Sequence, residues 1–447
     1  MAQTKQLFGT DGIRGVAGQY PLDRATVRAF GEALGKWCAA HASPAEVLLG
    51  MDTRESGPWL ASEVAAGLRR YGVATRFAGL ITTPGIAYLT RRRDFVAGVM
   101  ISASHNPYQD NGLKVFDSSG FKLPDEQERH LETGILALRE TAGSDAAPDL
   151  PVDGALDEEY IDYLASTFPG SLDGMPLALD CANGAASHLA PELFQRLGAR
   201  VAAFGCRPDG RNINKDCGAL HAGALREQVM AAGAAAGAAF DGDADRCILI
   251  SESGRIVDGD AVLYLAAKWL KKQGRLPGDL VVSTVMSNIG LERALSGLGI
   301  RMLRTPVGDK YVLEEMLRQN AALGGEQSGH VIFREYATTG DGLLTALRVL
   351  EIVRRAGCGL DELAADLVVY PQTLVNVRVR QRKPLAELTR VNDEIRAVEG
   401  AFGDSGRVLV RFSGTEPLAR VMVEGPEQSL VEAAARRIAG AIELELA

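Results

Sequence analysis

A chain of 447 residues with 46% hydrophobic content has room for about three domains of ordinary size, each able to bury a core. Its formal net charge of −9 argues against nucleic acid and membrane surfaces as partners, because both favour proteins with a basic face. The six cysteines show no paired spacing, and neither a signal segment nor a membrane-spanning stretch is visible, so we expect a cytoplasmic protein.

The chain repeats one pattern three times: an apolar strand, then a helix that ends at a glycine, then a second strand. The strands fall at 47–49, 177–179 and 280–282, and the helix ends fall within 68–77, 194–201 and 294–302. A chemically distinctive loop follows each repeat, which predicts that the three loops occupy equivalent places. We therefore expect an α/β fold with three similar mixed-sheet domains (1–152, 153–253 and 254–369) and a smaller C-terminal α+β domain (370–447) around a central cleft.

The first loop reads Ser102-Ala103-Ser104-His105-Asn106-Pro107 and follows an apolar strand at 98–101. Open α/β sheets bind ligands at this edge, so a hydroxyl there is a candidate reactive group, although an ordinary strand-to-turn junction has the same composition. Nothing in the spacing chooses Ser104 over Ser102. A Ser–His hydrolase is disfavoured, because adjacent residues in extended chain point apart and His105 would not reach Ser104.

The second loop, at 240–246, alternates three aspartates with small residues and ends in arginine: Asp241, Asp243, Asp245 and Arg246. In an extended segment the three carboxylates point the same way and repel each other unless a cation lies between them. Oxygen ligands without His or Cys favour Mg²⁺ or Ca²⁺. An EF-hand is excluded because Arg246 occupies the position that needs glycine. A phosphatase with Asp241 or Asp243 as nucleophile stays open.

The third and fourth loops suit a sugar and a phosphate. The third loop reads Gly324-Gly325-Glu326-Gln327-Ser328-Gly329-His330. Its carboxylate, amide and hydroxyl side chains can hydrogen-bond to sugar hydroxyls, although a plain glycine-rich hairpin turn has the same composition. The segment 411–417 combines small residues, two hydroxyls and flanking arginines, a typical phosphate cradle. It lacks the lysine of a P-loop, so nucleotide binding is not implied.

With the N-terminal segment Phe8-Gly9-Thr10-Asp11-Gly12-Ile13-Arg14-Gly15, the four loops resemble, in order, the α-D-phosphohexomutase family and most closely its phosphoglucosamine mutase branch. The resemblance runs from about Leu7 to Glu424 and includes matches at 180–185, 214–218 and 305–309. It implies an isomerase that interconverts glucosamine 6-phosphate and glucosamine 1-phosphate through a phosphoserine and a bisphosphate intermediate, for UDP-N-acetylglucosamine and cell wall precursor synthesis. Lys310 departs from the arginine that is commoner in this branch.

The resemblance also implies roles for individual residues. Ser104 matches the phosphorylated serine and, with Asp241, Asp243 and Asp245, the ligands of Mg²⁺. Lys114 and His330 match the positions credited with proton transfer, and we expect Arg14 to lower the pKa of Lys114. The implied substrate-binding residues are Glu326 and Ser328 for the sugar, Arg246 for the transferring phosphate, and Arg411, Ser413, Gly414, Thr415 and Arg420 for the second phosphate.

The implied ligands are Mg²⁺, a small sugar phosphate, and a hexose or glucosamine 1,6-bisphosphate as activator. Three alternatives stay open: a phosphoglucomutase or phosphomannomutase of the same family, an aspartyl-phosphate phosphatase, and a catalytically silent sugar-phosphate or calcium-binding protein. The sequence leaves the oligomeric state undecided, with a homodimer among the options.

Overall fold

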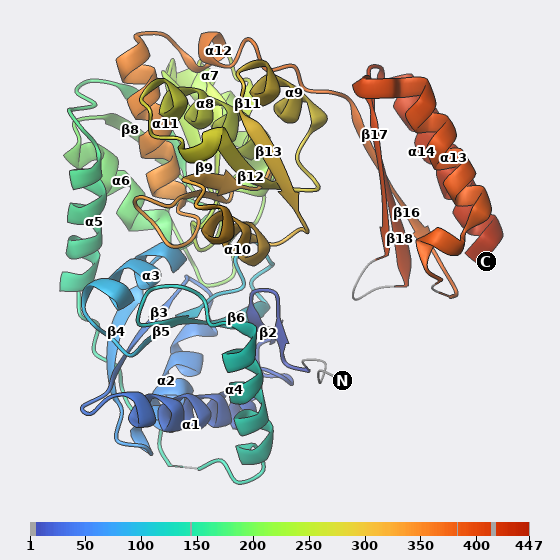
Figure 1. Cartoon of the computed structure of the whole chain (residues 1–447). Coiled ribbons are helices and arrows are strands. Elements are labelled where there is room, and N and C mark those ends of the chain that lie inside the picture. Colours follow the sequence, from blue (N-terminus) through green and yellow to red (C-terminus); the bar gives the residue numbers. More distant parts are fainter. Residues whose placement is uncertain (1–5, 144, 382, 413–416, 447) are drawn as a thin grey trace.

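The computed structural model describes residues 6–143, 145–381, 383–412 and 417–446 of the chain. These residues form three α/β units that pack into one body and a fourth, smaller unit that stands to one side of it (Figure 1). The predicted fold class is therefore confirmed. Within the described ranges, no helix combines the length and the apolar character needed to cross a membrane.

The first unit is built on a six-stranded mixed sheet with the order β1-β2-β6-β5-β3-β4. Its elements are β1 (Phe8–Gly9), β2 (Gly12–Val16), α1 (Arg24–His41), β3 (Glu46–Met51), α2 (Gly57–Arg69), β4 (Ala74–Leu80), α3 (Thr83–Arg92), β5 (Ala97–Ile101), β6 (Asp110–Asp117) and α4 (Asp125–Leu138). Successive residues of β3 alternate between two cores, as a strand covered on both faces requires. Val47 and Leu49 pack with α1 and α2, whereas Leu48 packs on the side of α3.

The second and third units repeat this plan with fewer strands. The second has the strand order β11-β10-β9-β7-β8 and the third β13-β12-β14-β15. The elements of the second unit are α5 (Ala155–Thr167), β7 (Pro176–Asp180), α6 (Ala186–Arg196), β8 (Arg200–Phe204), α7 (Ala222–Ala232), β9 (Ala236–Phe240), β10 (Cys247–Ser251) and β11 (Ile256–Val257). Those of the third are α8 (Gly259–Lys272), β12 (Leu280–Thr284), α9 (Ile289–Gly297), β13 (Arg301–Thr305), α10 (Asp309–Gln319), β14 (Leu323–Gly325), β15 (Val331–Phe333), α11 (Gly342–Ala356) and α12 (Leu360–Leu363). Because β11 pairs with β10, the second sheet extends past residue 253, the predicted end of the second domain. The predicted domain limits therefore stay predictions.

The fourth unit is a three-stranded antiparallel sheet backed by two helices. Its elements are β16 (Gln372–Arg378), α13 (Thr389–Phe402), β17 (Arg407–Phe412), β18 (Leu418–Glu424) and α14 (Gln428–Leu446). Short 3₁₀ helices lie at Ala219–His221, Pro277–Asp279, Leu385–Glu387 and Gly403–Ser405.

The three repeats predicted from the sequence are present. In each of the first three units a strand that is parallel to its neighbour ends in a loop, and the chain returns as an antiparallel strand: β5 to β6, β9 to β10 and β14 to β15. The serine, aspartate and Glu326 loops join these pairs, so their predicted equivalence is confirmed. Positive φ angles follow the helix ends, at Gly72 (71°), Gly198 (94°) and Gly299 (67°), where glycine avoids the strain of a Cβ.

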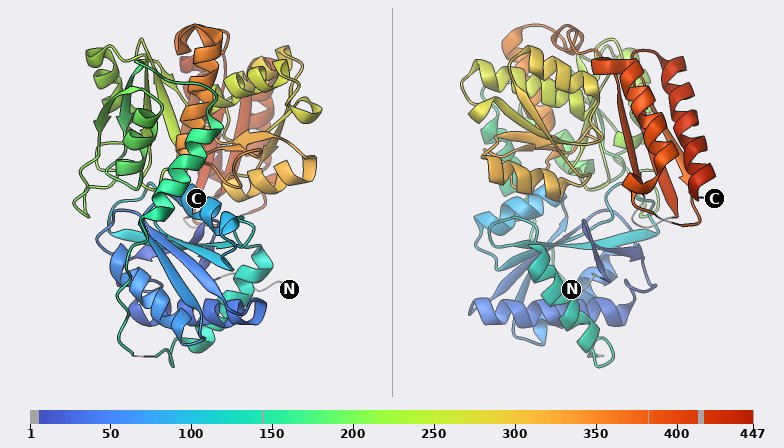
Figure 2. Two further views of the ribbon diagram at one scale, coloured as in Figure 1. Left: turned by 90° about the vertical axis from the view of Figure 1, so that its left-hand side faces the viewer. Right: turned by 45° about the vertical axis from the view of Figure 1, so that its right-hand side comes forward.

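Shared packing brings the three loops together. Met100 of β5, Phe240 of β9 and Leu323 of β14, each in the strand that leads to a loop, belong to one hydrophobic cluster that spans the three units. The fourth unit has a separate cluster that includes Val421 and Ile438. Figure 2 shows the second and third units above the first, with the fourth reached by the chain that follows α12. One continuous core therefore fixes three of the four loops relative to one another.

Candidate active site

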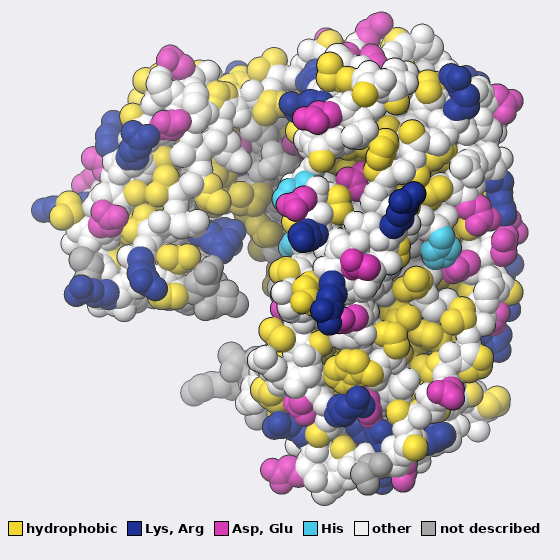
Figure 3. All heavy atoms as spheres, turned by 180° about the vertical axis from the view of Figure 1, so that it is seen from behind, with side chains coloured by type: hydrophobic (Ala, Val, Ile, Leu, Met, Phe, Trp, Pro, Cys, Tyr) yellow, Lys and Arg dark blue, Asp and Glu magenta, His cyan; other side chains and the backbone are white. Residues whose placement is uncertain are grey.

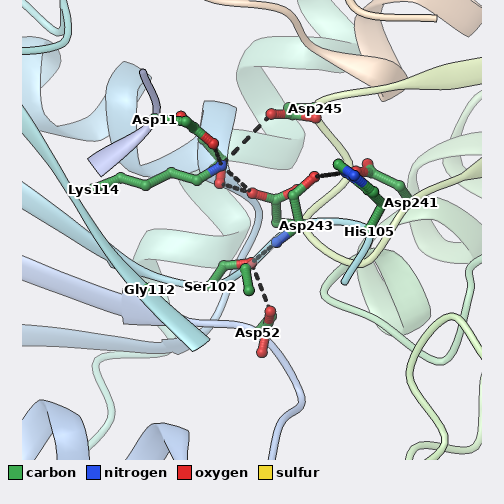
Figure 4. A network of polar contacts seen from close by, with 12 residues as sticks. Asp11, Asp52, Ser102, His105, Gly112, Lys114, Asp241, Asp243 and Asp245 are labelled. Carbon is green, nitrogen blue, oxygen red and sulfur yellow. Dashed lines mark hydrogen bonds and ion pairs between the residues drawn. The ribbon is translucent and has the colours of Figure 1, made fainter. Parts of the chain in front are cut away.

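The two serines of the first loop have different partners. Ser102 Oγ donates to Asp52 Oδ2 at 2.6 Å and accepts the backbone N–H of Ser104 at 2.9 Å, so it stays within the first unit. Ser104 Oγ instead donates to Asp241 Oδ2 of the aspartate loop at 2.6 Å (Figure 4 shows this group of residues). Ser104 has a φ of +52°, a left-handed conformation that costs a non-glycine residue roughly 1–3 kcal/mol. The structure thus singles out Ser104, which the sequence spacing did not.

The expectation that His105 points away from Ser104 is wrong. Its Nδ1 lies 3.3 Å from Ser104 Oγ, because the left-handed backbone at Ser104 replaces the extended chain that we had assumed. Burial, reinforced by Arg246 and Arg14, lowers the pKa of His105 to about 4, so the ring is neutral near pH 7. Within the described residues His105 forms no hydrogen bond to a carboxylate, so a hydrolase triad is not assembled.

The three aspartates converge as predicted, but not through an extended segment. Their carboxylate oxygens lie within 4.8 Å of one another, and all three residues are buried. A turn produces this arrangement: the N–H of Ala244 donates to Asp241 O at 3.0 Å, and Ala244 has a φ of +54°. The next residues form β10 rather than the helix of an EF-hand, as expected.

The donor set of the aspartate loop fits a hard divalent cation. Asp243 Oδ1 and Asp245 Oδ1 are buried and accept no hydrogen bond from any described residue. Burial raises the pKa of Asp241 to about 8, and the charges of Asp245 and Asp243 act in the same direction. Three carboxylates so close together disfavour one another's ionisation, and a cation between them removes that penalty.

Lys114 reaches the aspartates from β6, in the middle of the polar network of Figure 4. It is 1% exposed, and its Nζ lies 2.8 Å from Asp243 Oδ2 and 3.0 Å from Asp11 Oδ2. Burial and Arg14 lower the pKa of Lys114, but Asp11, Asp243 and Asp245 outweigh them and the net direction is upward. Arg14 therefore acts in the expected direction, but the three carboxylates prevent it from bringing the pKa of Lys114 below its ordinary value.

Sequence reasoning missed Asp11, a second carboxylate that pairs with several basic side chains of this network. Although burial alone would raise its pKa, Lys114, Lys122 and Arg14 hold the pKa of Asp11 well below its usual range. Lys122 also pairs with Asp309 at the start of α10, so this carboxylate–lysine chain ties the first unit to the third. Asp11 lies inside the N-terminal motif, and an acid next to glycines at the end of a short strand was the available signal.

A cavity of about 370 Å³ opens over these groups, a volume within the usual range for small-molecule sites. All three units of the main body contribute to it, through Arg14, His105, Asp245, Arg246, Asp309, Glu326 and His330 among others. Lys114 and Ser104 lie behind this lining, where they contact Asp11 and His105 respectively. Predicted residues from three distant parts of the sequence therefore meet at one site.

In the third loop, Glu326 and His330 line the cavity, whereas Ser328 does not. Glu326 Oε1 accepts the N–H of Gly308 at 3.0 Å, which fixes the carboxylate at the cavity wall. His330 Nε2 accepts the N–H of Gly340 at 3.0 Å, so in the neutral ring the proton is on Nδ1, 3.6 Å from Asp245 Oδ2. Burial opposes protonation of His330, but Asp245, Asp309 and Glu326 together outweigh it and raise the pKa. Ser328 is exposed and is not brought to the cavity.

The predicted second phosphate site lies in the fourth unit. Ser413, Gly414 and Thr415 fall outside the described residues. Arg411 of β17 lies directly opposite Arg420 of β18, and burial together with Arg420 lowers the pKa of Arg411. Like charges opposite each other on antiparallel strands disfavour one another, and an anion would offset this. No described residue of the fourth unit lines the 370 Å³ cavity, and Figure 3 shows a deep hollow between this unit and the main body.

The remaining sequence observation concerns Lys310, which pairs with Asp125 of α4 and does not line the cavity. Arg54, a residue that the sequence did not point to, contacts Ser104 directly, because its Nη2 donates to the Ser104 carbonyl at 2.8 Å. It is 1% exposed and its Nε donates to Asp52 Oδ2 at 2.9 Å. Both residues follow β3, at the same sheet edge as Ser104, and polar residues directly after an apolar strand were the signal for them.

Comparisons with known proteins agree with this geometry. Models of the phosphoglucomutase/phosphomannomutase family match four successive segments: α/β/α domain I at 5–142, domain II at 158–254, domain III at 258–370 and the C-terminal domain at 374–441. A phosphoglucosamine mutase of Solibacter usitatus is 63% identical over 442 residues, covering 99% of both chains. One from Koribacter versatilis is 50% identical over 449 residues, covering 98% of this chain and 97% of the relative.

Solved structures show the same fold. A phosphoglucomutase/phosphomannomutase family protein from Burkholderia thailandensis superposes with a TM-score of 0.80 at 25% identity, covering 97% of each chain. An Aspergillus fumigatus N-acetylphosphoglucosamine mutase, solved with GlcNAc-6P and magnesium, has a TM-score of 0.68 at 19% identity, covering 99% of this chain and 96% of that one. With four matched domains and a full-length relative at 63% identity, the chain belongs to the phosphoglucosamine mutase branch of the α-D-phosphohexomutase family.

Proposed function

We propose that Ser104 carries the phosphoryl group in the interconversion of glucosamine 6-phosphate and glucosamine 1-phosphate. Phosphoserine donates its phosphoryl group to a free sugar hydroxyl, whose proton passes through an acid–base group to the released Ser104 oxygen, and a bisphosphate forms. The sugar then turns end for end, and the other phosphate returns to the Ser104 oxygen. The observation that carries this proposal is the 2.6 Å contact between Ser104 Oγ and Asp241, next to a cavity lined by Arg14 and Arg246.

Asp241, Asp243 and Asp245 would hold Mg²⁺, with an oxygen of phosphoserine as a further ligand. When bound, the ion offsets the charge of three carboxylates beside a phosphate dianion and polarises the phosphoryl group. The Oδ1 atoms of Asp243 and Asp245 are buried and accept no hydrogen bond from any described residue, which supports this set of ligands. Arg246, whose side chain lies over the aspartate loop and lines the cavity, contacts the transferring phosphate.

Lys114 and His330 are the proposed acid–base groups. His330 lines the cavity and can meet a sugar oxygen directly, whereas Lys114 lies behind Asp11 and Asp245. Carboxylates next to Lys114 favour its ammonium form, so it can return a proton to the oxygen from which phosphate leaves, whereas His330 holds its Nδ1 proton on the side of Asp245. The second phosphate of the sugar is bound by Arg411 and Arg420 together with Ser413, Gly414 and Thr415, and a bisphosphate primes Ser104.

The preferred sugar separates this branch from its relatives. We expect glucosamine 6-phosphate to exceed glucose 6-phosphate by at least about tenfold in kcat/KM, because one or two hydrogen bonds to the ammonium group are worth ~2–3 kcal/mol. A coupled assay that compares glucosamine, glucose and mannose 6-phosphates, each with a trace of bisphosphate, measures this directly. Equal or reversed preference would place the protein with the phosphoglucomutases and phosphomannomutases.

Glu326→Ala tests the sugar-binding assignment of the third loop. The carboxylate is fixed by the N–H of Gly308 at the cavity wall, so its loss removes a hydrogen-bond acceptor from the sugar and leaves that N–H unpaired. We expect kcat/KM to fall by roughly 10- to 100-fold for both glucosamine and glucose 6-phosphates, as expected from about 1.5–3 kcal/mol for a charged hydrogen bond. Ser328→Ala, at an exposed position away from the cavity, is the comparison, and a larger loss there would reverse the assignment.

A further inference from the structure

The carbonyl oxygen of Ser104 is held by side chains from two different units. Arg54 Nη2 of the first unit donates to it at 2.8 Å, and Asn214 Nδ2 of the second unit donates at 2.9 Å. Both side chains also reach the carbonyl of Asn106, at 2.9 and 3.2 Å respectively. Two side chains therefore hold the backbone of the serine loop at Ser104 and just after it, in the left-handed conformation that directs the Ser104 hydroxyl to Asp241.

Asn214 is itself fixed close to the aspartate loop. Its backbone N–H donates to Ala182 O at 2.8 Å. Gly242 packs against it so closely that a Cβ at this glycine would lie 2.9 Å from Asn214 Nδ2 and 2.5 Å from Ser104 O. The side-chain amide of Asn214 therefore sets the position of the serine loop relative to the loop that carries the three aspartates.

We infer that Asn214 is a positioning residue for phosphoryl transfer, which acts with Arg54 by holding the Ser104 hydroxyl in register with the aspartates. This inference rests on the proposed role of Ser104. Asn214 is not among the described residues that line the cavity, so we expect no direct contact between its side chain and the sugar phosphate. Misplacing a reacting group by about 1 Å can cost on the order of 100-fold in rate. Loss of the amide should therefore lower kcat by roughly 10- to 100-fold and leave KM within about twofold.

Two substitutions remove the donor in different ways. Asn214 has a φ of +59°, and Asn214→Gly keeps this backbone conformation without strain while deleting the amide. Asn214→Asp keeps the size of the side chain but turns a carboxylate oxygen toward the carbonyls of Ser104 and Asn106. Asn212→Ala is the matched control, because among the described residues the Asn212 side chain hydrogen-bonds only to the backbone of Asp209 and Arg207 in its own loop.

Each variant is measured for kcat and KM with glucosamine 6-phosphate, for the single-turnover rate at which the bisphosphate rephosphorylates Ser104, and for thermal unfolding. We expect both Asn214 variants to lose kcat and rephosphorylation rate together, at unchanged KM and with cooperative thermal unfolding retained, and Asn212→Ala to behave like the wild type. A kcat for Asn214→Gly equal to that of the control overturns the inference, as does a parallel change of kcat, KM and melting temperature. If the Asn214→Asp variant does not fold, the kcat and KM of the Asn214→Gly variant alone test the inference. A wild-type enzyme that turns over without phosphate on Ser104 refutes the proposed function instead.

Discussion

Ser104→Ala is expected to lower mutase turnover by at least about 10³-fold, because the variant has no oxygen to accept and return the phosphoryl group. The fold should persist. Among the described residues, Ser104 Oγ hydrogen-bonds only to Asp241 and His105, and the bonds that hold the Ser104 carbonyl do not involve the hydroxyl. The measurement is steady-state turnover of glucosamine 6-phosphate, with the melting temperature as the check on folding.

A peptide map of the purified wild-type protein accompanies this test. We expect phosphate on the peptide that contains Ser104 and none on Ser102, whose hydroxyl is occupied by Asp52 and by the N–H of Ser104. An active Ser104→Ala variant, or phosphate mapped to another residue, would contradict the assignment. An alkali-labile adduct on Asp241 or Asp243 would favour the aspartyl-phosphate phosphatase.

Asp243→Asn should reduce activity on the order of 100-fold and shift the Mg²⁺ requirement to higher concentration, because one of three charges is lost from a cation site built from carboxylates. Asp243 is also the nearest carboxylate to Lys114 Nζ, at 2.8 Å, so the substitution leaves that ammonium group less compensated. Activity is measured across an Mg²⁺ titration that begins in excess chelator.

The control for this variant removes a carboxylate elsewhere. Asp366→Asn breaks a surface pair with Lys268, whose Nζ lies 3.0 Å away, and should leave both turnover and the Mg²⁺ titration unchanged. Full wild-type activity in chelator, or an Asp243→Asn enzyme with an unaltered Mg²⁺ titration, would refute the metal assignment.

Most of the fold could be predicted from short segments of the sequence. The apolar runs before each loop predicted the strands β5, β9 and β14, and the glycines after the helices predicted where the chain returns to the sheet. Both signals depend on near neighbours in the chain, because burial of a strand and the end of a helix are decided within a few residues. The identity of each loop was also local, since the aspartates, Glu326 and the serine pair are consecutive or nearly so.

Side-chain direction was the part that local reasoning could not supply. Extended geometry was assumed for both the serine and the aspartate loops, whereas Ser104 and Ala244 have φ angles of +52° and +54°. A serine rarely adopts this conformation without supporting contacts, and here Arg54 and Asn214 both donate hydrogen bonds to the Ser104 carbonyl. The contact between His105 and Ser104 follows from that backbone and from nothing in the spacing.

The sequence by itself determined the α/β class, the repeated plan and the chemical character of each loop, because strand burial, turn residues and donor types are properties of short segments. Only the tertiary structure decided that Ser104 rather than Ser102 faces the aspartates, that Asp11 joins Lys114 and Lys122, and that carboxylates raise the pKa of Lys114. These outcomes depend on residues more than 90 positions apart in the chain, such as Ser104 and Asp241, whose separation is set by the core that the three units share.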